Sequence, residues 1–297
     1  MMSTRALRAR PSNAPRVLPV RHQLAGLAGL ALLRAIVRGD GAAQRRARAA
    51  QHALAALGGR ERTRTLRQWQ IEIEAGYREW APTYDQPNIL VTLEQREVLR
   101  LLADVPVGTA VDAGCGTGRY ARRLLARGYA VVGVDRAAAM LAIAARRCPG
   151  ARFLQADIRR LPLASGSSSL VVCALTLGHV ARTGPALREF ARVLAHGGSV
   201  VVSDLHPFSA TFLGWRAGFT RASGQRAFIT SYPHAHAEYV RAFTSAGLAV
   251  DRYVEPTIGA PAADRYAQAL GASAYGVVIR DALVGLPALQ IWRARKA

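Results

Sequence analysis

A glycine-rich turn constrains the fold of this chain more than any other feature. The segment reads Val111-Asp-Ala-Gly-Cys-Gly-Thr-Gly-Arg-Tyr120, with glycines at positions 114, 116 and 118. Glycine adopts backbone conformations that other residues avoid. A bare backbone also lets a ligand approach the N-terminus of the helix that follows. The spacing therefore predicts a tight turn from a strand into a helix, with a ligand bound against it.

Strands and helices alternate around and after this turn. The predicted strands are short apolar runs at residues 110–113, 130–135, 152–155, 170–175 and 199–203, separated by helical segments. Strands joined by helices of this length form right-handed crossovers in a parallel sheet that is covered on both faces. The sequence thus predicts an α/β, doubly wound fold.

An acidic residue stands at the end of three successive predicted strands. These residues are Asp112, Asp135 and Asp157, and Asp135 follows the glycines by 17 to 21 residues. An acid in that position accepts hydrogen bonds from ribose hydroxyls in nucleotide-binding folds. Any one of them could instead cap the following helix. All three in this order favour a nucleoside site.

Composition excludes several other classes of protein. Apolar residues make up 51% of the chain and charged residues 20%, which is typical of a globular domain. No apolar run reaches the roughly 18 to 20 residues of a membrane-spanning helix, and the longest, at 24–37, contains Arg34. Three scattered cysteines indicate reduced thiols. We expect a soluble cytoplasmic protein, a monomer or homodimer, with no transmembrane segment.

The N-terminal region is strongly basic. Of the net charge of +21, residues 1–70 contribute 14 arginines against two acids. We expect residues 1–66 to be a basic, partly disordered or helical extension, with disorder over 1–22 and helices over 24–37 and 43–57. Basic amphipathic helices can bind nucleic acid or anionic membranes, and a poorly ordered extension is the other possibility.

Residues 67–297 are expected to form the main domain. It begins with predicted helices over 67–80 and 92–102. Two insertions, 205–233 and 258–285, interrupt its C-terminal half, the first with a possible hairpin at Ser223-Gly224. Insertions at the carboxyl ends of the strands in an open α/β sheet usually surround the substrate. We therefore expect both insertions to form a substrate lid.

On these motifs the chain resembles the class I S-adenosylmethionine-dependent methyltransferases, near the small-molecule branch of quinone- and biotin-pathway enzymes. The resemblance covers about Tyr77 to Arg295 and includes Gly133-Val-Asp135, Leu161-Pro-Leu163 and Gly197-Gly198. It implies a seven-stranded, mostly parallel Rossmann-like sheet and S-adenosylmethionine as cofactor. The chain departs from the family at Ser168-Ser169, where relatives usually have Phe-Asp, and in its long basic N-terminus.

The resemblance also implies which residues bind the cofactor. Asp135 would hold the ribose hydroxyls, Asp157 would accept from the adenine amino group, and Tyr84 would close over the sulfonium. The full set is Tyr84, Asp112, Gly114, Cys115, Gly116, Asp135, Arg136, Met140, Asp157, Ile158 and Leu175.

Two histidines are candidate catalytic bases. Methyl transfer is an in-line displacement, and an oxygen or nitrogen acceptor benefits from a base that takes its proton. His179 and His206 follow the fourth and fifth predicted strands, although either could simply bond to loop backbone. His234 and His236 are expected to be pocket-wall or capping residues. A metal there would need a third ligand, so no metal site is expected.

The sequence therefore predicts methyl transfer to a small organic acceptor, with oxygen favoured over carbon or nitrogen. Aromatic residues in the first insertion suggest an apolar or aromatic acceptor. Two alternatives stay open: an RNA- or protein-directed methyltransferase that uses the basic N-terminus, and a cofactor-binding protein that transfers nothing or catalyses a cyclisation. The glycine spacing argues against a nicotinamide dehydrogenase. The segment Ala174-Leu-Thr-Leu-Gly-His179 lacks the clamp of base-methylating enzymes, so no stable nucleic-acid partner is expected.

Overall fold

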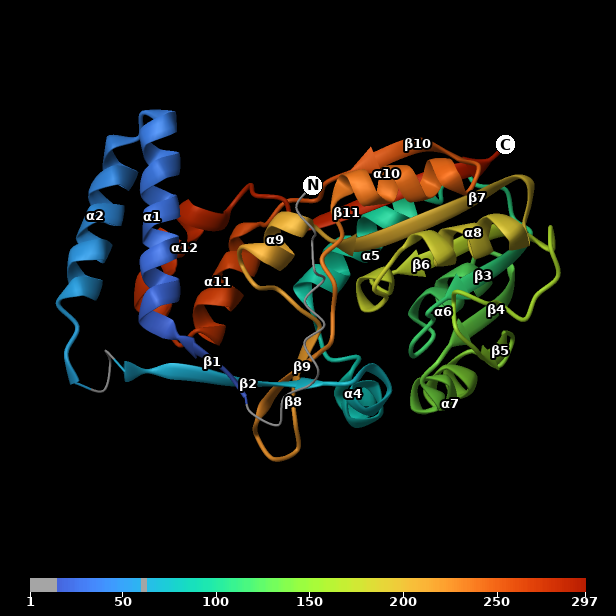
Figure 1. The fold of residues 1–297 in the computed structure, drawn as a ribbon, viewed down its shortest axis with the longest axis horizontal. Helices are drawn as coiled ribbons and strands as arrows, with labels where there is room; N and C mark the ends of the chain where they lie inside the picture. The colour runs from blue at the N-terminus through green and yellow to red at the C-terminus, as the bar shows by residue number, and fades with distance from the viewer. Residues whose placement is uncertain (1–14, 60–62) are drawn as a thin grey trace, which may run out of the picture.

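A seven-stranded sheet forms the centre of the molecule (Figure 1). The structure is a computed structural model that describes residues 15–59 and 63–297. The strand order is β10-β11-β7-β6-β3-β4-β5, with β11 antiparallel to both neighbours and the strands from β7 to β5 parallel. The strands are β3 (Thr109–Ala113), β4 (Ala130–Asp135), β5 (Arg152–Gln155), β6 (Ser168–Ala174), β7 (Leu194–Leu205), β10 (Leu248–Val254) and β11 (Leu289–Lys296). The prediction of a doubly wound, mostly parallel sheet is confirmed.

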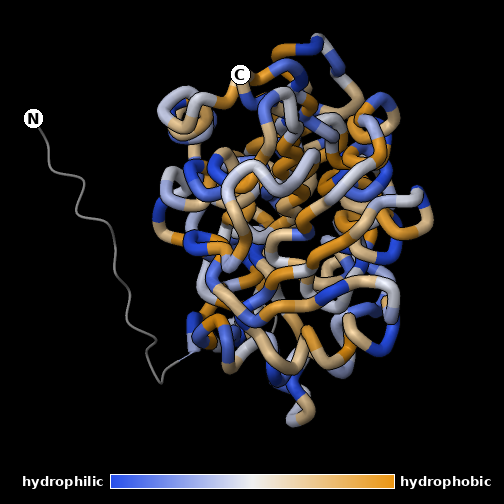
Figure 2. The backbone as a smooth tube through the Cα atoms, turned by 90° about the vertical axis from the view of Figure 1, so that its right-hand side faces the viewer, coloured by the Kyte–Doolittle hydropathy of each residue, from blue (hydrophilic) through white to orange (hydrophobic). Residues whose placement is uncertain are grey.

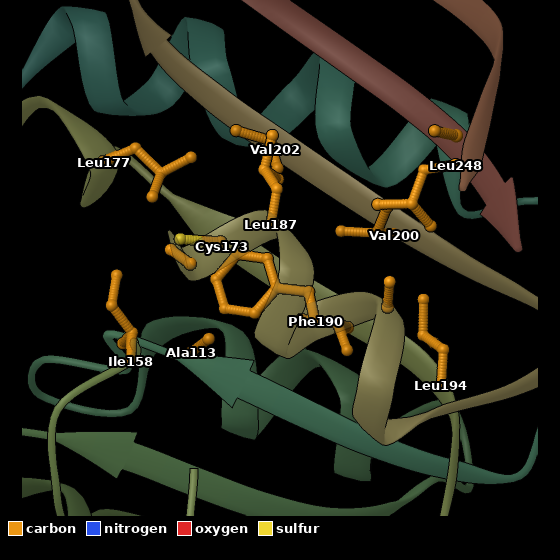
Figure 3. Packing of buried hydrophobic residues seen from close by; sticks show 14 of the residues in the cluster. Ala113, Ile158, Cys173, Leu177, Leu187, Phe190, Leu194, Val200, Val202 and Leu248 are labelled. Carbon is orange, nitrogen blue, oxygen red and sulfur yellow. The ribbon is translucent and has the colours of Figure 1, made fainter. Parts of the chain in front are cut away.

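Helices cover both faces of this sheet because its strands are apolar on both sides. The flanking helices are α5 (Ile89–Leu101), α6 (Arg119–Leu125), α7 (Ala138–Arg147), α8 (Gly184–Val193) and α10 (His236–Ser245). Successive side chains of β7 point to opposite faces of the sheet. Val200 and Val202 therefore pack with Phe190 of α8 on one face, whereas Val201 packs with Leu124 of α6 on the other. Figure 3 shows Phe190 beneath Val200 and Val202.

A smaller sheet combines the N-terminal region with the first insertion. Its order is β1-β2-β9-β8, and β2 runs parallel to β9. The strands are β1 (Arg16–Pro19), β2 (Thr65–Ile71), β8 (Gly218–Thr220) and β9 (Arg226–Ile229). The expected hairpin at Ser223-Gly224 joins β8 to β9. The predicted helix over 67–80 is wrong in its first half, because the edge of β9 draws those residues into β2. Helix α4 (Ile73–Trp80) begins only after it.

Four helices form a separate cluster at one end of the molecule (Figure 1). They are α1 (Val20–Arg38), α2 (Gly41–Ala55), α11 (Ala260–Ala269) and α12 (Gly276–Leu283), so the N-terminal region packs on the second insertion. The two predicted N-terminal helices are confirmed. The prediction of disorder is wrong for residues 16–22, which lie in β1 and α1, and residues 1–14 fall outside the described residues. In Figure 2, many of the apolar segments of the backbone run through the interior of the molecule.

Helix α1 is held tightly in this cluster. Ala28, Ala31 and Leu24 are buried against the other helices. The Arg34 guanidinium donates to the carbonyl oxygens of Ala282 and Val284, the latter at 2.7 Å. By length and composition α1 is the one helix in the described part of the chain that could cross a membrane. The helix is longer than the predicted 24–37 because it begins at Val20, although its first turn contains the polar residues Arg21, His22 and Gln23.

Candidate functional site

The glycine turn brings the ends of β3 and β6 into direct contact. Gly114, Gly116 and Gly118 all have positive φ, at 76°, 52° and 83°. A Cβ atom on Gly114 would lie 2.3 Å from the Thr176 side chain, so no larger residue fits. The Gly116 amide donates to Asp135 Oδ2 at 2.8 Å, and Gly118 begins α6. The turn leaves bare backbone at the carboxyl edge of the sheet.

A cavity lies at this edge and is lined by nine of the eleven residues predicted to bind the cofactor. We call it the first cavity. These nine residues are Tyr84, Gly114, Gly116, Asp135, Arg136, Met140, Asp157, Ile158 and Leu175. They come from separate elements that meet only because the strands are parallel. The sequence motifs therefore converge on one place in the fold.

Asp112 and Cys115 do not line the first cavity, which differs from the expectation. Asp112 is buried behind the turn, where its Oδ2 accepts from the Ala121 amide at 2.8 Å. Burial raises the pKa of this carboxyl to about 7. The Cys115 thiol is buried against Gly133. Both side chains pack on the side of the turn away from the first cavity, and neither lines that cavity.

The two other strand-end acids differ in electrostatics. Asp135 accepts from the amides of Gly116 and Ala137, which leaves about two of its four acceptor positions free. Burial raises the pKa of Asp135. Asp157 accepts from the Arg159 guanidinium at 2.6 and 2.9 Å, and this contact lowers the pKa of Asp157. The cavity thus has one buried acceptor and one firmly ionised acceptor.

Leu175 carries backbone strain at the end of β6. Its φ is 53°, and it is the one non-glycine residue with positive φ in the described ranges. The Leu175 amide donates to the Ser203 carbonyl at 2.9 Å. The Ser203 hydroxyl donates to Glu94 at 2.6 Å, and Arg119 pairs with Glu94 at the same distance. Fully buried Glu94 was missed in the sequence, where an acid on a helix face resembles any surface residue.

His179 has a defined tautomer. Its Nδ1 lies 2.9 Å from the Thr230 carbonyl oxygen, which can only accept, so Nδ1 carries the proton. Its Nε2 therefore accepts from the Tyr77 hydroxyl at 2.8 Å. Burial lowers the pKa of His179, so the ring is neutral at pH 7. Tyr77 was not predicted as a functional residue, because α4 precedes every motif.

A second cavity, of about 270 Å³, adjoins the first. The two cavities share Tyr77, Tyr84, Leu175 and His179 in their walls. Asp204 also lines the second cavity, accepts from the Tyr239 hydroxyl at 2.7 Å, and has its pKa raised by burial to about 6. His179 therefore stands where two binding spaces meet.

His206 lies outside both cavities, contrary to the expectation of a catalytic role. Its Nδ1 accepts from the Phe208 amide at 3.2 Å and so caps α9 (Pro207–Thr211). Its Nε2 then carries the proton and donates to Glu255 at 3.0 Å. With His236, these groups cluster within 4.8 Å. A metal ion would have to displace the Nε2 proton before this nitrogen could bind it.

His234 and His236 line neither the first nor the second cavity, so the expected pocket-wall role is not seen in the described structure. His234 Nε2 donates to the carbonyl oxygens of Leu177 and Val180, and its Nδ1 lies 3.0 Å from Glu238. The short loop that carries His179 is thereby tied to α10. The His236 ring lies against Tyr253, with centroids 5.6 Å apart.

Comparison with known proteins identifies the sheet domain. A family model described as a methyltransferase domain matches residues 111–202. Residues 111–202 therefore form a methyltransferase domain of the class I, S-adenosylmethionine-dependent type. Among curated relatives, this methyltransferase domain is similar to the demethylmenaquinone methyltransferase of Renibacterium salmoninarum, with 33% identity over 155 residues, half of this chain and 64% of the relative. It is also similar to the malonyl-[acyl-carrier protein] O-methyltransferase of Enterobacter lignolyticus, with 33% identity over 49% of this chain and 59% of the relative. The chain thus spans less than two thirds of the length of these relatives.

Solved structures agree on the fold of the methyltransferase domain. A geranyl diphosphate C-methyltransferase from Streptomyces coelicolor has a TM-score of 0.53, with 20% identity over 70% of this chain and 81% of that one. A [4+2]-cyclase has a TM-score of 0.52, with 19% identity over 75% of this chain and 94% of that one. At such low identity these likenesses establish the architecture alone.

The first cavity fits S-adenosylmethionine, the cofactor of this family. Gly114 and Gly116 present bare backbone, which suits the methionine part of the molecule. Asp135 retains acceptor capacity for ribose hydroxyls. Met140 and Ile158 are buried apolar side chains that can flank a flat ring. The polarity and the hydrogen-bond capacity of these residues match the cofactor.

Proposed function

We propose that this protein transfers a methyl group from S-adenosylmethionine to a small organic acceptor, with an oxygen atom as the favoured site. The observation that carries the proposal is the shared wall of the first and second cavities at Tyr77, Tyr84, Leu175 and His179. A donor in one cavity and an acceptor in the other would meet across that wall. Relatives named for quinone and malonyl-[acyl-carrier protein] methylation support a small acceptor.

The protein would contribute alignment and proton removal. Bound S-adenosylmethionine supplies an electrophilic methyl group on a sulfonium. Tyr84 presents an aromatic face, which attracts a cation, and His179 Nε2 has a lone pair in a buried site. As the acceptor oxygen loses its proton to the Tyr77 oxygen, the Tyr77 proton would pass to His179 Nε2. The products would be a methylated oxygen, a protonated imidazole and the neutral thioether S-adenosylhomocysteine, which keeps the electron pair of the broken bond between sulfur and the methyl group.

The second cavity favours an apolar acceptor. Trp80, Leu90 and Val91 lie in its wall beside the polar groups. We propose that residues 67–297 form the catalytic domain, with insertions 205–233 and 258–285 serving as the lid together with α1 and α2. The three cysteines are buried free thiols, which supports a reducing compartment such as the cytoplasm.

One labelling experiment tests this proposal. S-adenosylmethionine labelled on its methyl group is incubated with the purified protein and host extract, and the organic, RNA and protein fractions are counted. We expect label in the organic fraction with the wild type, about 10² to 10⁴ times less with His179→Ala, and undiminished label with Glu97→Ala, which changes a carboxylate that pairs with Arg100 outside the cavities. Label in RNA or protein would contradict the proposal. Cofactor binding without any labelled product would favour the alternative without transfer.

A further inference from the structure

A third cavity, of about 460 Å³, continues from the second. The two share five wall residues, which are Pro87, Asn88, Leu90, Leu205 and Arg216. Leu18, Ile89 and Trp215 add apolar surface along the third cavity. A single elongated molecule could therefore occupy both spaces.

Four arginines line the third cavity without acidic neighbours. They are Arg16 on β1, Arg216, Arg226 on β9 and Arg265 on α11. No aspartate or glutamate is among the described residues that line it. Over residues 15–59 and 63–297, none of the four forms an ion pair, whereas Arg119, Arg159 and Arg293 each do. The cavity therefore concentrates uncompensated positive charge.

Arg216 is the most unusual of the four. Its Nε is buried and has no hydrogen-bond partner in the described structure. Its guanidinium lies 5.3 Å from the centre of the Phe228 ring. Burial, and secondarily the nearby charge of Arg16, lowers the pKa of Arg216. A buried donor without a partner costs free energy unless a ligand satisfies it.

We propose that the third cavity binds the anionic end of the acceptor, a phosphate or diphosphate ester whose apolar body reaches into the second cavity. Arginine binds oxyanions through paired, charge-assisted hydrogen bonds. Four arginines match a multiply charged oxyanion better than a single carboxylate. Arg216 lines both cavities, so it would hold the ester where the apolar body begins. This inference rests on the proposed function, since it names the acceptor class for the same site.

The test titrates inorganic pyrophosphate into the full chain at ~150 mM salt and measures the heat of binding. The variant pair Arg216→Gln with Arg265→Gln removes two positive charges from the cavity. The matched control, Arg241→Gln with Arg252→Gln, removes two from exposed positions outside it. We expect saturable binding that weakens at least about tenfold in the first variant and less than about twofold in the control.

Several outcomes would overturn this inference. Equal weakening in both variants would mean general attraction to a basic protein, and no saturable binding would mean no site. Tighter binding of citrate would reject the phosphate assignment. Tighter binding of an RNA oligonucleotide, lost in the same cavity variant, would point to nucleic acid instead.

Two further readouts separate this inference from the proposed function. S-adenosylmethionine affinity and the melting temperature are measured in both variants, to show that the first cavity and the fold are intact. Pyrophosphate binding at the arginines without methyl transfer by the wild type would contradict the proposed function alone. Methyl transfer by the wild type without pyrophosphate binding would contradict the inference alone.

Discussion

Asp135 is the residue whose change should affect cofactor binding most directly. Asp135→Ala is expected to weaken S-adenosylmethionine binding by about 1.5 to 3 kcal/mol, the usual value for hydrogen bonds to a charged group. The change also leaves the Gly116 amide without its carboxylate partner. Calorimetric titration of the cofactor measures the effect, with Glu97→Ala as the control. An unchanged affinity would mean that the ribose lies elsewhere.

His179 should control turnover and leave cofactor affinity nearly unchanged. His179→Ala, or Tyr77→Phe, is expected to lower kcat by about 10² to 10⁴, the contribution typical of a general base. Burial lowers the pKa of His179, so the ring stays neutral through pH 7 and the wild-type rate should fall only below about pH 6.5. Rate profiles from pH 5 to 8 measure this. A rate that already falls at a pH above 6.5 would contradict the assignment of His179 as the base. The control variant His206→Ala is expected to keep full activity.

At the scale of elements, the sequence revealed what short-range pattern encodes. Buried parallel strands such as β3 and β6 are apolar runs in the sequence, so their positions along the chain could be predicted. Strand β2 could not, because Thr65–Ile71 becomes a strand only through pairing with β9, far along the chain. Tyr77 and Glu94 act through partners from other elements. The role of His206 depends on which of its ring nitrogens carries the proton, and its neighbours in the fold determine this. These contacts join residues that are far apart in the sequence, so no local pattern of residues predicts them.

Arg34 fastens one helix to another and should matter for stability. Arg34→Met removes its hydrogen bonds to the carbonyls at the C-terminal end of α12. We expect a loss of about 1.5 to 3 kcal/mol in the free energy of unfolding. Denaturant titration checks this, with exposed Arg38→Met expected to change stability by less than about 0.5 kcal/mol. Equal effects of the two substitutions would show that the contacts carry no stability.

At the scale of the molecule, the N-terminal region is part of the packed structure. Removal of residues 1–66 would strip α1, α2 and β1 from their partners and expose the buried faces of α11 and α12. We expect this deletion to unfold the helical cluster and abolish activity, as circular dichroism and turnover would report. That loss would not indicate nucleic-acid binding. Arg45→Gln with Arg48→Gln removes exposed charge from α2 and keeps its core residues, so activity should survive. Loss of activity in this variant would revive the alternative of an RNA or protein substrate.

The joining of the two ends of the chain has a consequence during synthesis. Helix α1 leaves the ribosome shortly before α2, on which it also packs, but long before its other partner α12, which spans Gly276–Leu283. At ~5 to 20 residues per second, the wait lasts roughly 10 to 50 seconds. Throughout that interval the part of α1 that packs on α12 in the folded protein has no native surface to cover it. The nascent chain therefore offers a prolonged binding site for chaperones, and slower translation lengthens the time it is exposed.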